Sequence, residues 1–191
     1  SEKSADKEAV TFHQVKGKET WGLVFDPGAA DGLAGTQTLL EYLQAVAWPA
    51  GKDLSNAAAG RFSSYTGIDG QPLPAGPRSN VPSDFGPFEA EFSMDSIGKT
   101  GDKCPFLYSN RTCISQKNIF FASYYENGDA LLIYPNLHNK SYGIRLLLTD
   151  SGHYYLIPVF NFEKLKEEQA KIQQANLHAT KEYEKITKHP S

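Results

Sequence analysis

Residues 118–160 constrain the fold more than any other part of the chain, because their pattern predicts four antiparallel strands in succession. The first strand, Asn118 to Glu126, is rich in Ile, Phe and Tyr, and the second runs from Ala130 to Tyr134. Asn127 and Gly128 between them favour a two-residue type I′ turn. Such a turn would set two acidic residues opposite one another, so a longer loop stays open.

The second half of this region is a further predicted hairpin. Its strands run from Tyr142 to Leu148 and from His153 to Phe160, and Thr149-Asp150-Ser151-Gly152 supplies the turn. Pro158 has no amide hydrogen to donate, so we expect the last strand to lie at a sheet edge or to end in a bulge. Large apolar side chains on both faces of this meander require other elements to cover each face.

A first helix is predicted in the N-terminal half. Thr38 and Glu41 have the spacing of a capping box, and apolar residues at helical spacing follow until Pro49. The helix is amphipathic and is therefore suited to cover one face of a sheet.

A second helix is predicted at the C-terminus, because the chain has neither Gly nor Pro from Val159 to His189. Its apolar seam consists of Phe162, Leu165, Ile172, Ala179, Tyr183 and Ile186. Gln169 and Asn176 interrupt this seam. We expect the first half of the helix to pack on the sheet and the second half to project or to meet a partner. The alternative is a solvated helix that frays beyond Ile172.

These elements predict an α+β fold in a single domain, with an antiparallel β-meander, one amphipathic helix in the N-terminal half and a C-terminal helix. A half-buried strand is expected at Phe88 to Met94, where apolar and polar side chains alternate. Gly67 to Pro87 is rich in Gly and Pro and is expected to be an extended, irregular loop. We place a flexible tether at residues 1–15, the α+β domain at residues 16–161, and the C-terminal helix and tail at residues 162–191.

Composition excludes several classes of function. The chain has 191 residues with 19 basic and 22 acidic side chains and a formal net charge of -3, so no overall positive field attracts nucleic acid. No run of 18 apolar residues occurs, and the chain as given therefore contains no transmembrane segment.

The two cysteines, Cys104 and Cys113, favour an exported protein. Their spacing excludes a C-x-x-C redox motif, and two thiolates alone make a poor zinc site. A local disulfide, stable only in an oxidising compartment, is the favoured interpretation, with two unpaired core thiols of a cytosolic protein as the alternative. The short, charged start at Ser1 is typical of a lipoprotein tether that follows an upstream lipid anchor, although trimmed chains of other origin look similar.

No segment carries a complete catalytic or cofactor motif. The glycine loop from Asp26 to Gly35 lacks the G-x-G-x-x-G spacing and has no following Lys, so we expect a surface turn there. The five histidines are scattered along the chain, and neither a metal site nor a cofactor is predicted.

The most enzyme-like arrangement combines residues of the hairpin turns. His153 or His138 beside Asp129 or Asp150 would bring an imidazole and a carboxylate together at one end of the sheet for general acid–base catalysis. However, Asp is a preferred turn residue, and a histidine at the start of a strand needs no catalytic role. Enzymatic activity therefore stays undecided, and a non-catalytic role is favoured.

Tyrosine usage indicates a binding surface. Tyr124, Tyr125, Tyr154 and Tyr155 lie in the predicted meander. Tyrosine combines a rigid apolar ring with a polar end, a combination that recognition surfaces favour. The alternative is that these rings are ordinary core and rim residues of a twisted sheet.

Together these expectations favour an exported, periplasmic or lipoprotein-like, non-catalytic module that binds another protein, such as an inhibitor or an immunity protein. The partner would be a protein and not a nucleic acid, and the C-terminal helix would be available for oligomerisation. The competing hypothesis is a secreted hydrolase or a carbohydrate-binding protein whose site lies among the hairpin turns.

Overall fold

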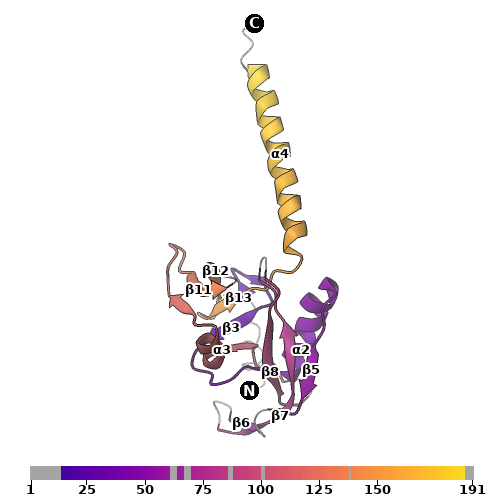
Figure 1. Ribbon diagram of the computed structural model, residues 1–191, viewed down its shortest axis with the longest axis vertical. Coiled ribbons are helices and arrows are strands. Elements are labelled where there is room, and N and C mark those ends of the chain that lie inside the picture. The colour runs from indigo at the N-terminus through magenta and orange to yellow at the C-terminus, as the bar shows by residue number, and fades with distance from the viewer. Residues whose placement is uncertain are drawn as a thin grey trace.

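A long mixed β-sheet runs through the molecule (Figure 1). The computed structural model describes residues 14–60, 64–66, 70–85, 88–99, 102–137 and 139–187. In this part of the chain the sheet has 11 strands, in the order β10-β11-β12-β13-β3-β9-β4-β8-β7-β5, with β6 paired to β7. β1 and β2 form a separate hairpin. The fold is a single α+β domain, as predicted.

The strands are β1 (Gln14–Val15), β2 (Lys18–Glu19), β3 (Leu23–Asp26), β4 (Leu33–Gly35), β5 (Ser55–Ala58), β6 (Ser64–Thr66), β7 (Pro72–Pro82), β8 (Glu91–Ile97), β9 (Leu107–Ser109), β10 (Ile119–Phe121), β11 (Ala130–Leu137), β12 (Lys140–Leu148) and β13 (Tyr154–Leu156). The helical segments are α2 (Thr36–Tyr42), the π-helix η1 (Leu43–Ala47), the 3-10 helix η2 (Trp48–Ala50), α3 (Asn110–Ser115) and α4 (Phe162–Thr187).

The four-strand meander predicted for residues 118–160 is confirmed. β10 pairs with β11, β11 with β12 and β12 with β13, each antiparallel. β10 ends at Phe121, however, so residues 122–129 form the longer loop in place of the tight turn at Asn127 and Gly128. β13 lies between β12 and β3 and ends at Leu156, before Pro158. The strand is therefore not at an edge, and its pairing shows no bulge; both alternatives are wrong, because the strand ends two residues before Pro158.

The helix of the N-terminal half begins at Thr36, two residues before the predicted capping box. Gly35 is the N-cap residue and makes no side-chain capping hydrogen bond. Instead, the backbone amides of Gln37 and Thr38 donate to the carbonyl oxygen of Asp102, at 2.9 and 3.4 Å. A neighbouring loop thus satisfies the amides that a capping side chain would otherwise satisfy.

In the region expected to be an irregular loop, the described residues 70–85 are mostly strand, because Pro72–Pro82 forms β7, the longest strand described; residues 67–69 and 86–87 of that prediction lie outside the described residues. Pro72 is the first residue of this strand, and Pro77 lies where the pairing with β8 shifts register, between Ala75 and Arg78. Strand starts and register shifts are the places where a sheet tolerates a residue that cannot donate. The proline content therefore predicted a loop where the structure has a strand with an irregularity.

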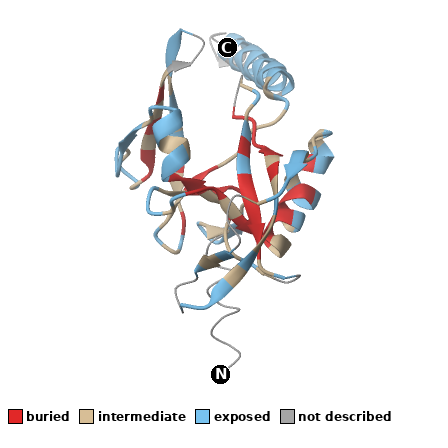
Figure 2. Ribbon diagram, turned by 60° about the horizontal axis from the view of Figure 1, so that its bottom comes forward, coloured by how far each residue is buried: buried red, intermediate tan, exposed pale blue. Residues whose placement is uncertain are grey.

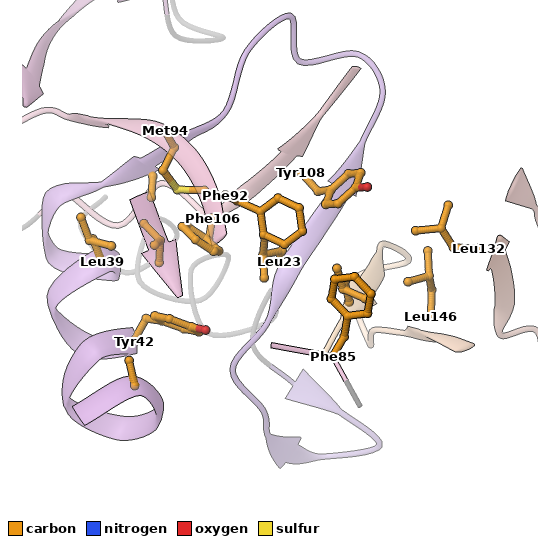
Figure 3. Close-up of a cluster of buried hydrophobic side chains, with 14 of the residues drawn as sticks. Leu23, Leu39, Tyr42, Phe85, Phe92, Met94, Phe106, Tyr108, Leu132 and Leu146 are labelled. Atoms are coloured by element: carbon orange, nitrogen blue, oxygen red, sulfur yellow. The ribbon is translucent and has the colours of Figure 1, made fainter. Parts of the chain in front are cut away.

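The hydrophobic core extends from the helical segments of the N-terminal half along the sheet to β11 and β12 (Figure 2). Figure 3 shows Leu39 and Tyr42 of α2 facing Phe106 and the side chains of the sheet. The rings of Tyr42 and Phe106 stack at 5.3 Å between centroids, and the Tyr42 hydroxyl donates to the carbonyl oxygen of Pro82 at 2.7 Å. In β8 the expected alternation is confirmed at Phe92 and Met94, which are buried.

Cys104 and Cys113 are both free thiols, so the predicted disulfide is wrong. Cys104 lies before β9, where its Sγ donates to the carbonyl oxygen of Pro105 at 3.6 Å. Cys113 lies in α3 and packs against the hydrophobic core. Burial raises the pKa of Cys104 to about 12 and that of Cys113 to about 11, so both thiols stay protonated at neutral pH. Each sulfur is held in its own half-buried environment.

The C-terminal helix α4 projects away from the sheet (Figure 1). Its first half does not pack on the sheet as expected, because its described side chains are exposed from Glu163 onward. Among the residues described, no helix is both long and apolar enough to cross a membrane. Residues 1–13 of the predicted tether lie outside the described residues, whereas Gln14–Val15 forms β1.

Candidate protein-binding surface

Exposed apolar side chains gather on and beside β10. Ile119, Phe120, Phe121 and Tyr124, which we call the β10 surface, are 37–59% exposed. With Ile114 in α3 they are five of the nine large hydrophobic side chains that are exposed in the described part of the chain. Burial of apolar surface contributes a favourable free energy of about 25 cal/mol per Å², which exposed side chains do not gain. A cluster of exposed apolar side chains therefore indicates a contact surface.

β10 is also the last strand at its end of the sheet. It pairs with β11, placing Ile119 opposite Ile133 and Phe121 opposite Leu131. On its other side no strand in the described part of the chain pairs with it. β10 has no charged residue and no proline, the residues that commonly protect a sheet edge. Its outward backbone groups are therefore available to a strand from another protein.

A buried hydroxyl network fixes the start of β10. Tyr108 of β9 donates to Oδ1 of Asn118, and the hydroxyl oxygens of Tyr108 and Tyr134 lie 2.6 Å apart. Asn118 Nδ2 donates to the carbonyl oxygen of Ile133 at 3.3 Å. Burial raises the pKa of both tyrosines, so the hydroxyls keep their protons. Because Asn118 directly precedes Ile119, this network ties the exposed strand to the core.

Aromatic rings from two strands that do not pair with β10 support Phe120. Its ring centroid lies 4.6 Å from that of Phe25 in β3 and 5.6 Å from that of Tyr154 in β13. The rings of Phe121 and Tyr124 lie 6.1 Å apart. Aromatic pairs at these spacings attract one another beyond the area they bury. The β10 surface is thus held in place while it remains exposed.

Tyr154 also fixes the loop that follows β10. Its hydroxyl accepts a hydrogen bond from the backbone amide of Ser123 at 3.1 Å and donates to the carbonyl oxygen of Gly128 at 3.0 Å. One side chain therefore holds both ends of the loop at residues 122–129. This loop carries Tyr124 and Tyr125, whose rings lie 5.1 Å apart, close to perpendicular.

Asp129 explains why this loop replaces a tight turn. Its Oδ2 accepts from Nε of Arg145 at 2.8 Å, and its Oδ1 accepts from the backbone amide of Leu148 at 2.9 Å. The guanidinium carbon of Arg145 lies 4.0 Å above the ring centre of Tyr125. A two-residue turn would have set Asp129 opposite Glu126, whereas the observed loop gives its carboxylate a cation and a donor.

The charge of Asp129 is maintained by these contacts. Burial alone would raise the pKa of the carboxyl, but hydrogen bonds from the Leu148 amide, the Asn127 side chain and Arg145 outweigh burial and lower the pKa. The carboxylate is therefore ionised at neutral pH and remains an acceptor for Arg145.

Three of the four predicted binding tyrosines lie in this region. Tyr124 belongs to the β10 surface, and the half-buried Tyr125 and Tyr154 support it. Tyr155 is 0% exposed, because successive residues of β13 point to opposite faces, and its ring faces the interior. Tyr155 is therefore removed from the candidate surface, and binding by the other three stays a prediction. Sequence analysis missed Phe120, whose exposure depends on the edge position of β10.

The residues of the predicted catalytic arrangement are engaged in separate turns. His153 Nδ1 lies 2.8 Å from the hydroxyl oxygen of Ser151. The carboxylate of Asp150 accepts from the amides of Lys16 and Gly17, at 2.8 and 2.9 Å. Asp129 holds Arg145, as described above, so the two carboxylates serve different turns. His138 lies outside the described residues.

A buried ion cluster joins β7, β8 and the loop before β4, and no sequence pattern indicated it. Arg78 donates to Oδ1 of Asp31 at 3.1 Å and to Oδ1 of Asp95 at 3.0 Å. The Tyr65 hydroxyl donates to Oδ2 of Asp95 at 2.8 Å. Asp95 is 0% exposed, and Arg111 Nε lies 3.3 Å from Oδ2 of Asp31. The expected surface turn is thus wrong for Asp31, which is buried and paired.

Comparisons with known proteins give no relative: the chain matches no protein-family model, no curated protein and no solved structure. Among the residues that the structure describes, no group of three or more His, Cys, Asp or Glu side chains is placed to hold a metal ion.

Proposed function

We propose that this protein is a non-catalytic binding module that holds another protein through the β10 surface. One observation carries the proposal: a free strand edge and a cluster of exposed aromatic side chains occur at the same place. The edge offers backbone hydrogen bonds, and the aromatic rings offer apolar area. Either feature alone is common on protein surfaces, whereas their combination suits the addition of a partner strand.

The partner would supply an extended segment that pairs with β10. Residues alternate along a strand, so Ile119 and Phe121 lie on one face and Phe120 on the other. Side chains of the added segment would thus meet apolar groups on both faces. Because the surface is already fixed by Asn118 and Tyr154, little conformational entropy is lost when the partner binds.

A more specific version of this proposal is an inhibitor or immunity protein, which would block its partner by occupying the partner's own edge or cleft. Export to the periplasm, as a soluble protein or with a lipid anchor, stays a prediction of the sequence. The free thiols of Cys104 and Cys113 remove the disulfide that favoured it.

The proposal is tested by recovering partners from native cells with the wild-type protein and with the F121S/Y124S double variant, purified side by side. Truncating a buried aromatic anchor costs about 2 kcal/mol of binding, which is about 30-fold in affinity. We therefore expect the double variant to lose the partner that the wild-type protein retains. Quantitative mass spectrometry of both eluates provides the comparison.

The matched control is the L40S/W48S double variant. Leu40 and Trp48 are 40% and 44% exposed, on the helical segments of the N-terminal half. This control should retain the partner. Equal recovery by F121S/Y124S, with an unchanged melting temperature, would contradict the proposal, as would loss of the same partner from the control.

A further inference from the structure

The projecting helix α4 has no cover in the described part of the chain. It is 26 residues long, which corresponds to about 39 Å, and its described side chains are exposed from Glu163 onward. Only its first turn meets the body of the protein, where Phe162 lines a pocket with Lys52 and Phe88. Helices that gain no tertiary packing are marginal in water, so a helix this long is expected to gain its stability from a partner.

The sequence of α4 carries a seven-residue repeat. With Phe162 as position a, the d positions are all apolar: Leu165, Ile172, Ala179 and Ile186. The a positions are Phe162, Gln169, Asn176 and Tyr183. A repeat of seven is the pattern of a left-handed coiled coil. Ile172 is 60% exposed, so this seam is open to a second helix.

We propose that α4 pairs with α4 of a second copy of this chain, as a parallel, in-register, two-stranded coiled coil. The inference does not depend on the β10 surface. Its main support is the position of the two polar residues of the seam. In a parallel pair in register, each a position faces the same position of the second copy. Asn176 then faces Asn176, and Gln169 faces Gln169, so each amide has an amide as its hydrogen-bond partner.

An antiparallel pair with full overlap is disfavoured by the same residues. In that arrangement a positions face d positions, so Asn176 would face Ile172 and Gln169 would face Ala179. Both amides would then be buried against apolar groups without a partner, at about 1–3 kcal/mol each. Partner choice in coiled coils commonly depends on such a polar position in the seam.

The charges that flank the seam favour the same orientation. In the parallel pair, position g faces position e of the next heptad, so Glu168 meets Gln173 and Glu182 meets Thr187. Neither contact joins like charges. In the antiparallel pair with full overlap, Glu168 would face Glu182 twice, and like charges held this close repel. A second copy in parallel orientation is thus the occupant that α4 fits.

The parallel pair places both globular domains at the same end of the coiled coil. Each β10 surface would then be linked to a second one by α4 and by residues 157–161. A partner that displays two binding segments would bind such a dimer more tightly than it binds one domain, because its second contact becomes intramolecular.

The test compares the mass in solution of the wild-type chain and of two variants by analytical ultracentrifugation over a concentration series. We expect the wild-type protein to approach twice its monomer mass of 21.1 kDa. Ile172→Glu places a charge in the seam and should halve the mass while the melting temperature of the domain is unchanged. Leu177→Glu is the matched control, because Leu177 is 56% exposed and lies at position b, outside the seam.

A wild-type chain that stays at 21.1 kDa at every concentration would overturn the proposal. Equal masses for the two variants would do the same, because the seam would then play no part.

Orientation is tested by disulfide formation in oxidised glutathione. In a parallel pair the Ile172→Cys variant should form a covalent dimer on a non-reducing gel, whereas the wild-type protein and Leu177→Cys should not. If a mixture of Ile172→Cys and Asn176→Cys gives mainly the mixed dimer, the helices are antiparallel and the proposed orientation is wrong.

Discussion

Two regions toward opposite ends of the sheet depart from the usual separation of polar surface and apolar core. One region buries charged side chains, and the other exposes apolar side chains. At β7, β8 and the loop before β4, the carboxylates of Asp31 and Asp95 are buried, and the half-buried Arg78 pairs with both. At β10, the apolar rings of Phe120 and Phe121 remain 37% and 46% exposed. Buried charges that all have partners within the chain stabilise one conformation of the protein. Exposed apolar side chains that nothing in the chain covers indicate a contact with another protein.

The largest expected effect is on stability, at the buried cluster. Arg78→Ala leaves the buried carboxylates of Asp31 and Asp95 without their shared cation. Removing one partner of a buried ion pair costs about 3–5 kcal/mol, so we expect the free energy of unfolding to fall by about that amount. Urea denaturation of the variant and of the wild-type protein measures the difference.

Arg111→Ala is the matched control, because Arg111 also contacts Asp31 but its side chain is 57% exposed. Asp31 is buried, but its Oδ1 keeps the hydrogen bond from Arg78 when the exposed Arg111 is removed, so this variant should lose much less stability than Arg78→Ala. Equal losses of stability in the two variants would contradict the claim that the buried carboxylates depend mainly on Arg78.

Asp129→Asn should have the next largest effect on the free energy of unfolding, about 2 kcal/mol, because the carboxylate accepts hydrogen bonds from Arg145 and from the Leu148 amide beside the β10 surface.

This effect should depend on pH. The pKa of Asp129 is lowered by folding, so its contribution to stability is complete above its ordinary pKa, near 4, and is lost as the pH falls through the lowered value. The gap in stability between wild type and variant should therefore close in acid. Urea denaturation at a series of pH values provides the measurement, and a gap that persists in strong acid would contradict this role.

Tyr108→Phe should cost about 1 kcal/mol, because it removes the hydroxyl that joins Tyr134 to Asn118 in the core. This substitution tests the link between core and surface. Beyond the loss of stability, the backbone amides of β10 should exchange hydrogen faster than in the wild-type protein. If exchange at β10 is unchanged, Asn118 does not anchor the strand.

The smallest expected effect on stability is at the β10 surface itself. Phe121→Ser should change the free energy of unfolding by less than about 0.5 kcal/mol, because the ring is 46% exposed. The same substitution should lower partner affinity by about 30-fold. Thermal denaturation and partner recovery on the same preparation give both values, and a large loss of stability would show that Phe121 belongs to the core.

The parts of the fold that follow from local patterning were predictable. The meander at residues 118–160 depends on alternation and turn residues close together in the chain, and its strand order is observed. β7 was not predictable in this way, because its four prolines favour a loop locally, whereas pairing with β5, β6 and β8 makes this segment a strand. The thiols of Cys104 and Cys113 show the same limit, since spacing along the chain did not determine where their side chains lie.

The candidate surface was predicted in part, for a related reason. The tyrosine content of the meander indicated a binding surface. It does not indicate which face of β13 is buried, and Tyr155 lies on the buried face. The exposure of Phe120 depends on the position of β10 at the end of the sheet, which residues far away in the chain decide. Likewise, Asp31 and Arg78 form an ion pair although they are 47 residues apart in the sequence, and no local sequence pattern predicts that contact.

A partner strand that pairs with β10 would protect the backbone amides of this strand, and amide hydrogen exchange measures that protection directly. Exchange is measured residue by residue in the free protein and in the complex recovered from native cells. Protection that appears on binding at Ile119, Phe120 or Phe121, and that is absent from the F121S/Y124S variant, is the predicted result. A complex in which these three amides exchange as fast as in the free protein, while another surface becomes protected, would contradict it.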